Sequence, residues 1–294
     1  GDISERYLAL IEGLDAESCH IATRTLRRLK QYAETGNDVF QTTAAEDAKF
    51  RELIDYHYNR ILPLPDGWFL YDGKWFLPSP EISSTVFYYL HFLPDLMAPE
   101  RLKGCDILDI GAHMGDSALI FSEFTDGTIW SFEPSPSNFA LLEKTITRNE
   151  LENILPMQLA LGDKRGETTI VEHGDMSKLM SNGDGEKVEV TTVDAFVADH
   201  DIKPGLLKLD VEGFEMNVLA GAEKTIRLYQ PILLISIYHN FDQFFQAREW
   251  VEALDLGYRF KLRKPSDLAV AIDLNLICEV DPDRVTHTPD SGKG

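Results

Sequence analysis

Short apolar runs alternate with segments of helical periodicity between about residue 104 and residue 280. The first five runs are continuously apolar, which is typical of parallel strands buried on both faces of a sheet. Helices are predicted over 115–125, 136–150, 215–229 and 242–256, and a hairpin or short edge strands over 166–196. This order predicts an α/β fold with a doubly wound, mostly parallel, seven-stranded sheet. The seven strands are predicted in "CDILDIGA", "GTIWSFEP", "ILPMQLALG", "GLLKLDVEG", "PILLISIYH", "YRFKLRK" and "LAVAIDLNLICEV".

The chain is expected to have three parts. Residues 1–80 are predicted to be a mainly helical extension, which could act as a lid or an oligomerisation element, so homo-oligomer formation stays open. Residues 81–280 are predicted to form the main domain, and residues 281–294 a polar tail. Thr43 and Glu46 have the spacing of a capping box, and Phe50, Leu53, Ile54, Tyr58 and Ile61 after them are predicted to be a buried stripe. The aromatic and proline-rich segment 63–98, with two Asp-Gly turns, either covers a pocket or packs as a connector.

Charge and cysteine content limit the classes of partner. The net charge is −21, and no block of Lys and Arg interleaved with aromatic residues offsets it, so a nucleic-acid partner is disfavoured. The longest apolar runs are too short to cross a bilayer, and no leader-like segment opens the chain. The three scattered cysteines predict neither a disulfide framework nor a zinc site, which favours a cytoplasmic setting.

Carboxylates stand at the ends of four of the first five predicted strands. Ligands bind at this edge of an open α/β sheet. Asp109 precedes Gly111 and Gly115, so the loop lacks the G-x-G-x-x-G pattern of a dinucleotide fold. A carboxylate beside bare backbone favours a cationic ligand group, such as the ammonium of an amino acid. Glu133 ends the next strand, where nucleoside-binding folds place an acid that accepts ribose hydroxyls.

The end of the third predicted strand has backbone groups and one carboxylate that could form hydrogen bonds with the edge of an adenine. A ligand with an amino-acid end, a ribose and a base is S-adenosylmethionine, and this cofactor is therefore predicted. The residues expected to bind it are Asp109, Gly111, Ala112, His113, Gly115, Glu133, Pro134, Ser135, Ala160, Leu161, Asp163 and Asp210.

Several motifs, in order, resemble the FkbM-type family of S-adenosylmethionine-dependent methyltransferases. The resemblance covers about 105–240, and "KLDVEGFE" is its most specific element; the others are "ILDIGAHMGDSAL", "FEPSPSNFALLEKTITRN", "LALGDKRGETTI", "TTVDAF" and "PILLISIYH". The resemblance implies a class I methyltransferase fold. It also implies an enzyme that transfers methyl groups to hydroxyls of sugars or secondary metabolites. The family usually has Asn where this chain has His113, whose role stays open. The first 80 residues match no pattern of the family.

His239 is the first candidate for a base that removes the acceptor proton, because histidine titrates near neutral pH. Asp210 and Glu212 are further catalytic candidates, whereas Glu215 is interpreted as an acid stabilised by a helix N-terminus. A Mg²⁺ or Mn²⁺ ion held by Asp210, Glu212 and His239 is an alternative, but no metal is predicted. On fold alone, a nicotinamide-dependent oxidoreductase is the competing enzyme class. A third hypothesis is a non-catalytic module that binds a partner through the first 80 residues.

Overall fold

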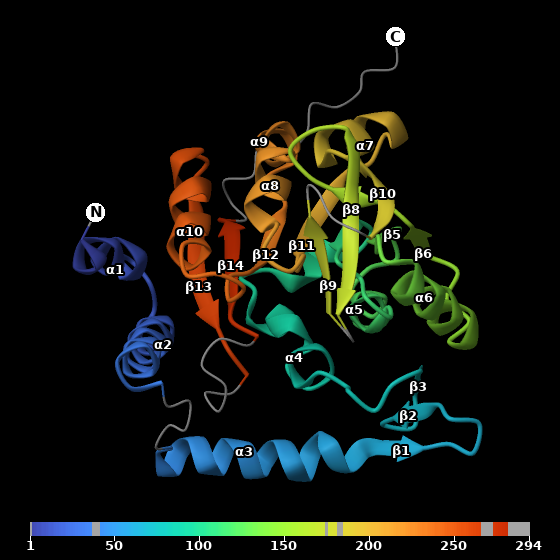
Figure 1. Ribbon diagram of the computed structural model, residues 1–294, viewed down its shortest axis with the longest axis horizontal. Helices are drawn as coiled ribbons and strands as arrows, with labels where there is room; N and C mark the ends of the chain where they lie inside the picture. The colour runs from blue at the N-terminus through green and yellow to red at the C-terminus, as the bar shows by residue number, and fades with distance from the viewer. Residues whose placement is uncertain (1, 37–41, 174–175, 181–184, 266–272, 282–294) are drawn as a thin grey trace.

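The computed structural model describes residues 2–36, 42–173, 176–180, 185–265 and 273–281 (Figure 1). A central seven-stranded sheet has the order β13-β14-β12-β11-β4-β5-β6. Strand β14 is antiparallel to both of its neighbours, and the other pairs are parallel. The strands are β4 (Asp106–Ile110), β5 (Ile129–Phe132), β6 (Ile154–Met157), β11 (Pro204–Leu209), β12 (Ile232–Ser236), β13 (Tyr258–Arg263) and β14 (Asn275–Val280). The predicted α/β class and the mostly parallel seven-stranded sheet are confirmed.

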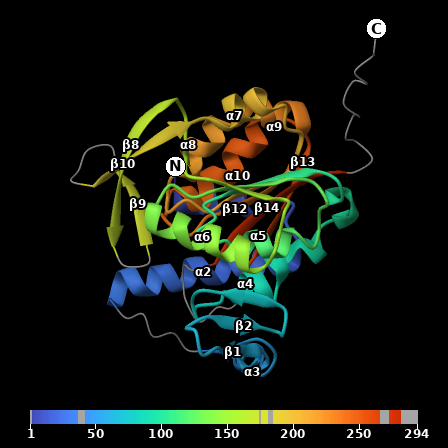
Figure 2. The same cartoon turned by 90° about the vertical axis from the view of Figure 1, so that its right-hand side faces the viewer.

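Helices cover both faces of this sheet, which explains why its parallel strands are continuously apolar. Figure 2 shows α7, α8, α9 and α10 on one face and α5 and α6 on the other. Within β4, for example, Ile107, Leu108 and Ile110 are all buried. The helices are α5 (Asp116–Phe121), α6 (Pro136–Arg148), α7 (Val193–His200), α8 (Glu215–Ala220), α9 (Glu223–Tyr229) and α10 (Gln243–Ala253).

Two predicted elements are each divided in the structure. The run 154–162 was expected to be one strand, but it forms β6 and then β7 (Ala160–Leu161), which belongs to a second sheet. The helix expected over 215–229 is broken between α8 and α9 at Gly221, where a Cβ atom would lie 2.0 Å from the carbonyl oxygen of Gly162. Both breaks therefore follow from packing between segments that are distant in the sequence.

The second sheet has the order β7-β10-β8-β9 and contains the predicted hairpin. Strand β8 is antiparallel to β9 and to β10, whereas β7 and β10 run parallel. Its remaining strands are β8 (Gly166–His173), β9 (Met176–Met180) and β10 (Glu186–Thr191). The first part of the last predicted strand, 268–272, and nearly all of the expected polar tail lie outside the described residues.

The chain before β4 forms helices and one small sheet. Helix α2 ends at Gly36, which has the left-handed φ of 64° expected of a helix stop. The predicted Asp-Gly turns join β1 to β2 and β2 to β3, and Asp72 and Gly73 have φ values of 50° and 68°. The elements are α1 (Ile3–Ile11), α2 (Ala16–Thr35), α3 (Ala44–Tyr56), η1 (Tyr58–Arg60), β1 (Ile61–Pro63), β2 (Phe69–Tyr71), β3 (Trp75–Leu77), α4 (Ser84–Phe87), η2 (Leu90–Asp95) and η3 (Pro99–Leu102).

Helices α1 and α2 are integral to the main core, because Leu10, Ile21 and Ala22 belong to the same buried cluster as residues of β11 and β12. By contrast, the stripe after the capping box is largely not core. The capping box of Thr43 and Glu46 is present, but Phe50, Ile54 and Tyr58 are exposed, and Leu53 is buried. Among the described residues no helix is long and apolar enough to span a membrane.

Candidate active site

A cavity of about 240 Å³ opens at the carboxyl ends of β4, β5 and β11. This is the edge at which open α/β sheets bind ligands. The segment before β4 also contributes to it through Ser83, Thr85, Val86 and His91, so the aromatic and proline-rich segment does cover a pocket. The remaining walls come mainly from the loops that follow the three strands and from residues of the second sheet.

The glycines of the loop after β4 are required because other parts of the chain pack closely against this loop. Gly111 has a φ of 86°, and a Cβ atom there would lie 1.8 Å from the carbonyl oxygen of Asp210. Gly115 has a φ of 90°, and its Cβ atom would lie 2.7 Å from the side chain of Leu142 in α6. The backbone is therefore bare so that β11 and α6 can approach it. This is a different reason from the ligand contact expected from the sequence.

His113 lies between these glycines and has a φ of 47°. The left-handed region is uncommon for residues other than glycine, although Asn, Asp and His are enriched there. This conformation explains why either the Asn usual in the family or a His fits this position. The backbone N–H of His113 donates to Oε2 of Glu133 over 2.9 Å.

Glu133 joins the glycine loop to the start of α6. Its Oε1 accepts from the backbone N–H of Ser135 over 2.9 Å, while Oε2 accepts from His113. Burial raises the pKa of Glu133, and the two backbone N–H donors oppose that rise. Each carboxylate oxygen has two lone pairs, so both retain an acceptor position. Glu133 lines the cavity and can therefore accept two hydroxyl donors from a ligand.

Asp109 lies behind the cavity wall. Its side chain is 0% exposed, and Oδ1 accepts from Nζ of Lys208 over 2.9 Å. Lys208 also donates to the carbonyl oxygen of Gly111 over 2.7 Å and itself lines the cavity. Burial raises the pKa of Asp109 to about 6 although Lys208 opposes the rise, and Asp109 and Asp210 raise the pKa of Lys208 despite its burial. The cationic partner that Asp109 was expected to find in a ligand is thus supplied by the chain.

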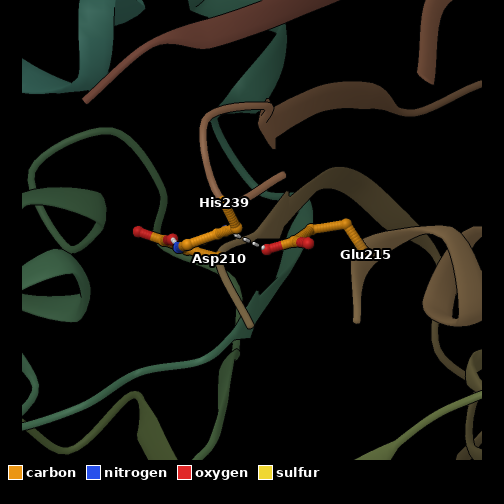
Figure 3. A group of neighbouring side chains, drawn as sticks. All are labelled: Asp210, Glu215 and His239. Carbon is orange, nitrogen blue, oxygen red and sulfur yellow. Dashed lines mark ion pairs between the residues drawn. The ribbon is translucent and has the colours of Figure 1, made fainter. Parts of the chain in front are cut away.

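His239 follows β12 and lies among three carboxylates, as the close-up in Figure 3 shows for Asp210 and Glu215. Nδ1 forms an ion pair with Oε1 of Glu215 at 2.7 Å, although the ring is not aligned for an ideal hydrogen bond. Nε2 lies 3.5 Å from Oδ1 of Asp210 and 3.6 Å from Oε2 of Glu212. Burial lowers the pKa of His239, but Glu215 and the other two carboxylates raise it above its ordinary value.

Glu215 is the buried support of this group. Its Oε1 accepts from the backbone N–H of Val211 over 2.9 Å, and Oε2 accepts from the side chain of Gln243. Burial raises its pKa, but His239 and the backbone N–H of Val211 lower it below the ordinary value. Glu215 was interpreted as a simple helix-start acid, whereas the structure makes it the residue that orients His239.

Asp210 and Glu212 present their carboxylates at the cavity. The hydroxyl of Tyr238 donates to Oδ1 of Asp210 over 3.2 Å. Glu212 has a φ of 53°, and burial raises its pKa although His239 opposes the rise. Left-handed backbone at a residue other than glycine costs about 1–2 kcal/mol and is concentrated at functional sites. The strain at Glu212 is therefore consistent with a chemical role.

The described cavity wall is rich in carboxylates. His91 also lines the cavity. Burial lowers its pKa to about 3, so its imidazole is neutral, and its Nε2 lies 3.2 Å from the hydroxyl oxygen of Ser117. Lys208 is paired as described above. The carboxylate residues of the wall are Asp116, Glu133, Asp210, Glu212 and Asp273.

The structure brings most, but not all, of the predicted site residues to the cavity. Asp163 is exposed and does not line it, and Ala112, Gly115 and Ser135 lie in the supporting loops. His239 stands directly behind Asp210 and Glu212. The predicted residues that line the cavity are Gly111, His113, Glu133, Pro134, Ala160, Leu161, Asp210 and Glu212.

Sequence reasoning missed Lys208, Asp273 and His91. Lys208 had a usable signal, because a lysine inside an otherwise apolar strand needs a partner on a neighbouring strand. Asp273 and His91 gave no such signal, because they reach the cavity from segments outside the predicted strand ends.

The sheet order, with one antiparallel strand between β12 and β13, together with a site at the carboxyl ends of β4, β5 and β11, defines the class I methyltransferase fold. Residues 109–260 match the model of the methyltransferase FkbM domain. The chain therefore belongs to the family of the methyltransferase FkbM domain. The resemblance inferred from the sequence is confirmed.

Relatives agree with this assignment. The chain is 27% identical over 152 residues to the hexuronic acid methyltransferase AglP of Haloferax volcanii, covering 49% of this chain and 60% of that protein. It is 25% identical over 144 residues to Methyltransferase 1 of Beauveria bassiana, covering 40% and 58%. The crystal structure of methyltransferase FkbM from Methylobacillus flagellatus KT superposes with a TM-score of 0.59 at 18% identity, covering 94% of this chain and 58% of that one. The matches thus span about three fifths of these proteins' lengths.

Proposed function

We propose that this protein binds S-adenosylmethionine in the cavity and directs its methyl group to a hydroxyl of a sugar or secondary metabolite. When bound, the cofactor supplies an electrophilic methyl group on a sulfonium. The observation that carries the proposal is the Glu133 carboxylate in the cavity wall, held by two backbone N–H groups at the end of β5. That position and that free acceptor capacity suit the two hydroxyls of a ribose.

The other walls fit the remaining parts of the cofactor. Pro134, Ala160 and Leu161 give an apolar surface for a base. Since Lys208 already neutralises Asp109, the carboxylates left for a ligand ammonium or sulfonium are Asp210 and its neighbours on the wall. A wall rich in carboxylates favours a cationic ligand over a polyphosphate, which supports S-adenosylmethionine over a nicotinamide dinucleotide.

The proton of the acceptor hydroxyl has a defined route in this proposal. Asp210 and Glu212 line the cavity, so one of them accepts the proton directly. His239 lies 3.5 Å and 3.6 Å behind their oxygens and is held by Glu215, so it is placed to accept the proton from them. Positioning of the acceptor by the wall supplies the rest of the rate enhancement.

The acceptor class is supported by the relative from Haloferax volcanii, whose name specifies a hexuronic acid. Neutral sugars and uronic acids are both included in the proposal. Each offers several hydroxyls to the carboxylates of the wall, which are strong hydrogen-bond acceptors.

Calorimetry with S-adenosylmethionine and with NAD tests the cofactor assignment. We expect binding of S-adenosylmethionine, and Glu133→Gln should weaken it by about 10- to 100-fold, as expected for losing hydrogen bonds to a charged group. The control Glu143→Gln changes an exposed acid of α6 and should bind normally. Binding of NAD without S-adenosylmethionine would refute the proposal, and equal affinity of both variants would refute the role of Glu133.

A mass-shift screen with isotope-labelled cofactor tests the transfer itself. Sugars and secondary metabolites with free hydroxyls are expected to gain one labelled methyl group. His239→Gln should lower turnover while leaving S-adenosylmethionine affinity nearly unchanged. Transfer to amine or thiol acceptors alone would contradict the proposed hydroxyl chemistry.

A further inference from the structure

The Nε2 atom of His239 is buried and, like Nδ1, has no hydrogen-bond partner of good geometry among the residues that the structure describes. The side chain is 8% exposed, so water cannot readily satisfy this nitrogen. Its neighbours are oxygens of Asp210 and Glu212 at 3.5 Å and 3.6 Å. These separations are long for hydrogen bonds, but they match two ligands of one ion, which lie about 3.0–3.6 Å apart when each bond is about 2.0–2.2 Å.

The opposite nitrogen of the ring lies beside a carboxylate, as in many metal-binding histidines. Nδ1 lies 2.7 Å from Glu215, which is fully buried and held by Val211 and Gln243. Histidine ligands commonly give their second N–H to a carboxylate, which fixes the tautomer and leaves the other nitrogen free to coordinate. Ligand atoms of Asp210, Glu215 and His239 all lie within 4.8 Å of one another. Figure 3 shows the imidazole between the two acids, so Glu215 supports the ring from behind and does not share an ion with Nε2.

We propose that Asp210, Glu212 and Nε2 of His239 bind one divalent cation of the Mn²⁺ type at the cavity wall. One imidazole and two carboxylates suit such an ion better than Ca²⁺, which prefers oxygen ligands only. Both carboxylates line the cavity, so the remaining coordination positions face it. The role of the ion rests on the proposed function: it would receive the acceptor hydroxyl and lower its pKa. In the ion-bound form the proton would pass to a carboxylate oxygen of the wall that is not bound to the ion, because a coordinated Nε2 cannot accept it.

Mn²⁺ titration of the chelator-stripped full chain tests the site without any turnover. Free Mn²⁺ is followed by electron paramagnetic resonance in 0.15 M salt, which screens weak binding to the acidic surface. We expect one tight equivalent per chain. His239→Gln and Glu212→Gln should each weaken it at least tenfold. Glu215→Gln, a positioning change, should weaken it by about 10- to 100-fold with an unchanged circular dichroism spectrum.

The control is Glu186→Gln, which changes an exposed acid of β10 and should bind Mn²⁺ like the unmodified chain. Weaker Mn²⁺ binding in His239→Gln, Glu212→Gln and Glu215→Gln, with normal binding in Glu186→Gln, supports the proposal. Absence of tight binding, or equal binding by all variants, overturns it. If His239→Gln does not fold, Glu212→Gln decides, because its side chain is 42% exposed.

Calorimetry with S-adenosylmethionine in the presence of chelator separates this inference from the proposed function. Cofactor binding without a tight Mn²⁺ equivalent would overturn only the cation site. Tight, variant-sensitive Mn²⁺ binding without cofactor binding would retain the cation site and refute the proposed function.

Discussion

Replacing Lys208 with Met removes one partner of the buried pair behind the cavity. Nζ lies 2.9 Å from Oδ1 of Asp109 and 2.7 Å from the carbonyl oxygen of Gly111. Oδ2 of Asp109 has no hydrogen-bond partner in the described part of the chain. Lys208 therefore provides most of the stabilisation of the buried negative charge of Asp109. Breaking a buried pair in this way costs about 3–5 kcal/mol of unfolding free energy near neutral pH, because Asp109 must then either stay charged without a partner or take up a proton.

The pH dependence of this loss follows from Asp109. Burial holds its pKa at about 6 with Lys208 present, and removal of the ammonium must raise it further. Below about pH 6 the folded forms of both proteins carry a protonated Asp109. Above that pH Asp109 ionises in the folded unmodified protein. In the folded variant Asp109 keeps its proton, although the same carboxyl has lost it in the unfolded chain. The deficit should therefore grow with pH above 6, by up to about 1.4 kcal/mol per pH unit.

Urea unfolding followed by circular dichroism at pH 5.5, 7 and 8.5 measures the effect. The matched control is the double variant Lys208→Met with Asp109→Asn, which removes both charges and should recover most of the loss. A deficit of the single variant that is independent of pH would refute the role of Asp109. So would a double variant that is as unstable as the single one.

Three further outcomes are expected. Gly111→Ala should lower the melting temperature strongly, because its Cβ atom would lie 1.8 Å from a carbonyl oxygen, whereas Gly166→Ala, with nothing within 4 Å, should not; thermal unfolding compares them. His113→Asn should leave stability unchanged or raise it by up to about 1 kcal/mol, since Asn suits a φ of 47°, and a destabilised variant would contradict this. Burial raises the pKa of Asp15, but hydrogen bonds from Ser18 and Arg263 hold it at about 2. Asp15→Ala should therefore cost about 1 kcal/mol at neutral pH in urea titrations. This difference should shrink as the pH falls from about 4 towards 2, because a lowered folded pKa stabilises only above the unfolded value.

Much of the sheet could be predicted from the sequence because its central strands are buried on both faces. Runs such as "GLLKLDVEG" leave few alternatives to a parallel strand, and the end of each strand then fixes where Glu133 and Asp210 lie. The spacing of apolar residues did not reveal the divided strand at 154–162 or the helix break at Gly221, because both depend on neighbours in space.

The supporting residues of the site could not be read from local patterns for the same reason. Lys208 meets Asp109 only because β11 pairs with β4 in the register that sets these two residues side by side. Glu215 looks like any acid in the first turn of a helix until β12 places His239 beside it. The exposed Phe50 and Ile54 show the converse error: the helical spacing of apolar residues in α3 predicts burial, but no element of the described part of the chain covers that face fully.

The charge of the wall connects the two proposals. With Lys208 paired to Asp109, the described wall presents five carboxylates to a ligand, and the proposed sulfonium cofactor would offset only part of that charge. A neutral sugar meets this wall without penalty, because hydroxyls donate to carboxylates. A uronic acid would bring a further negative charge into a partly buried site, where like charges repel strongly. A divalent cation among Asp210, Glu212 and His239 would offset two of the acids, so the range of acceptors should depend on whether that position is filled.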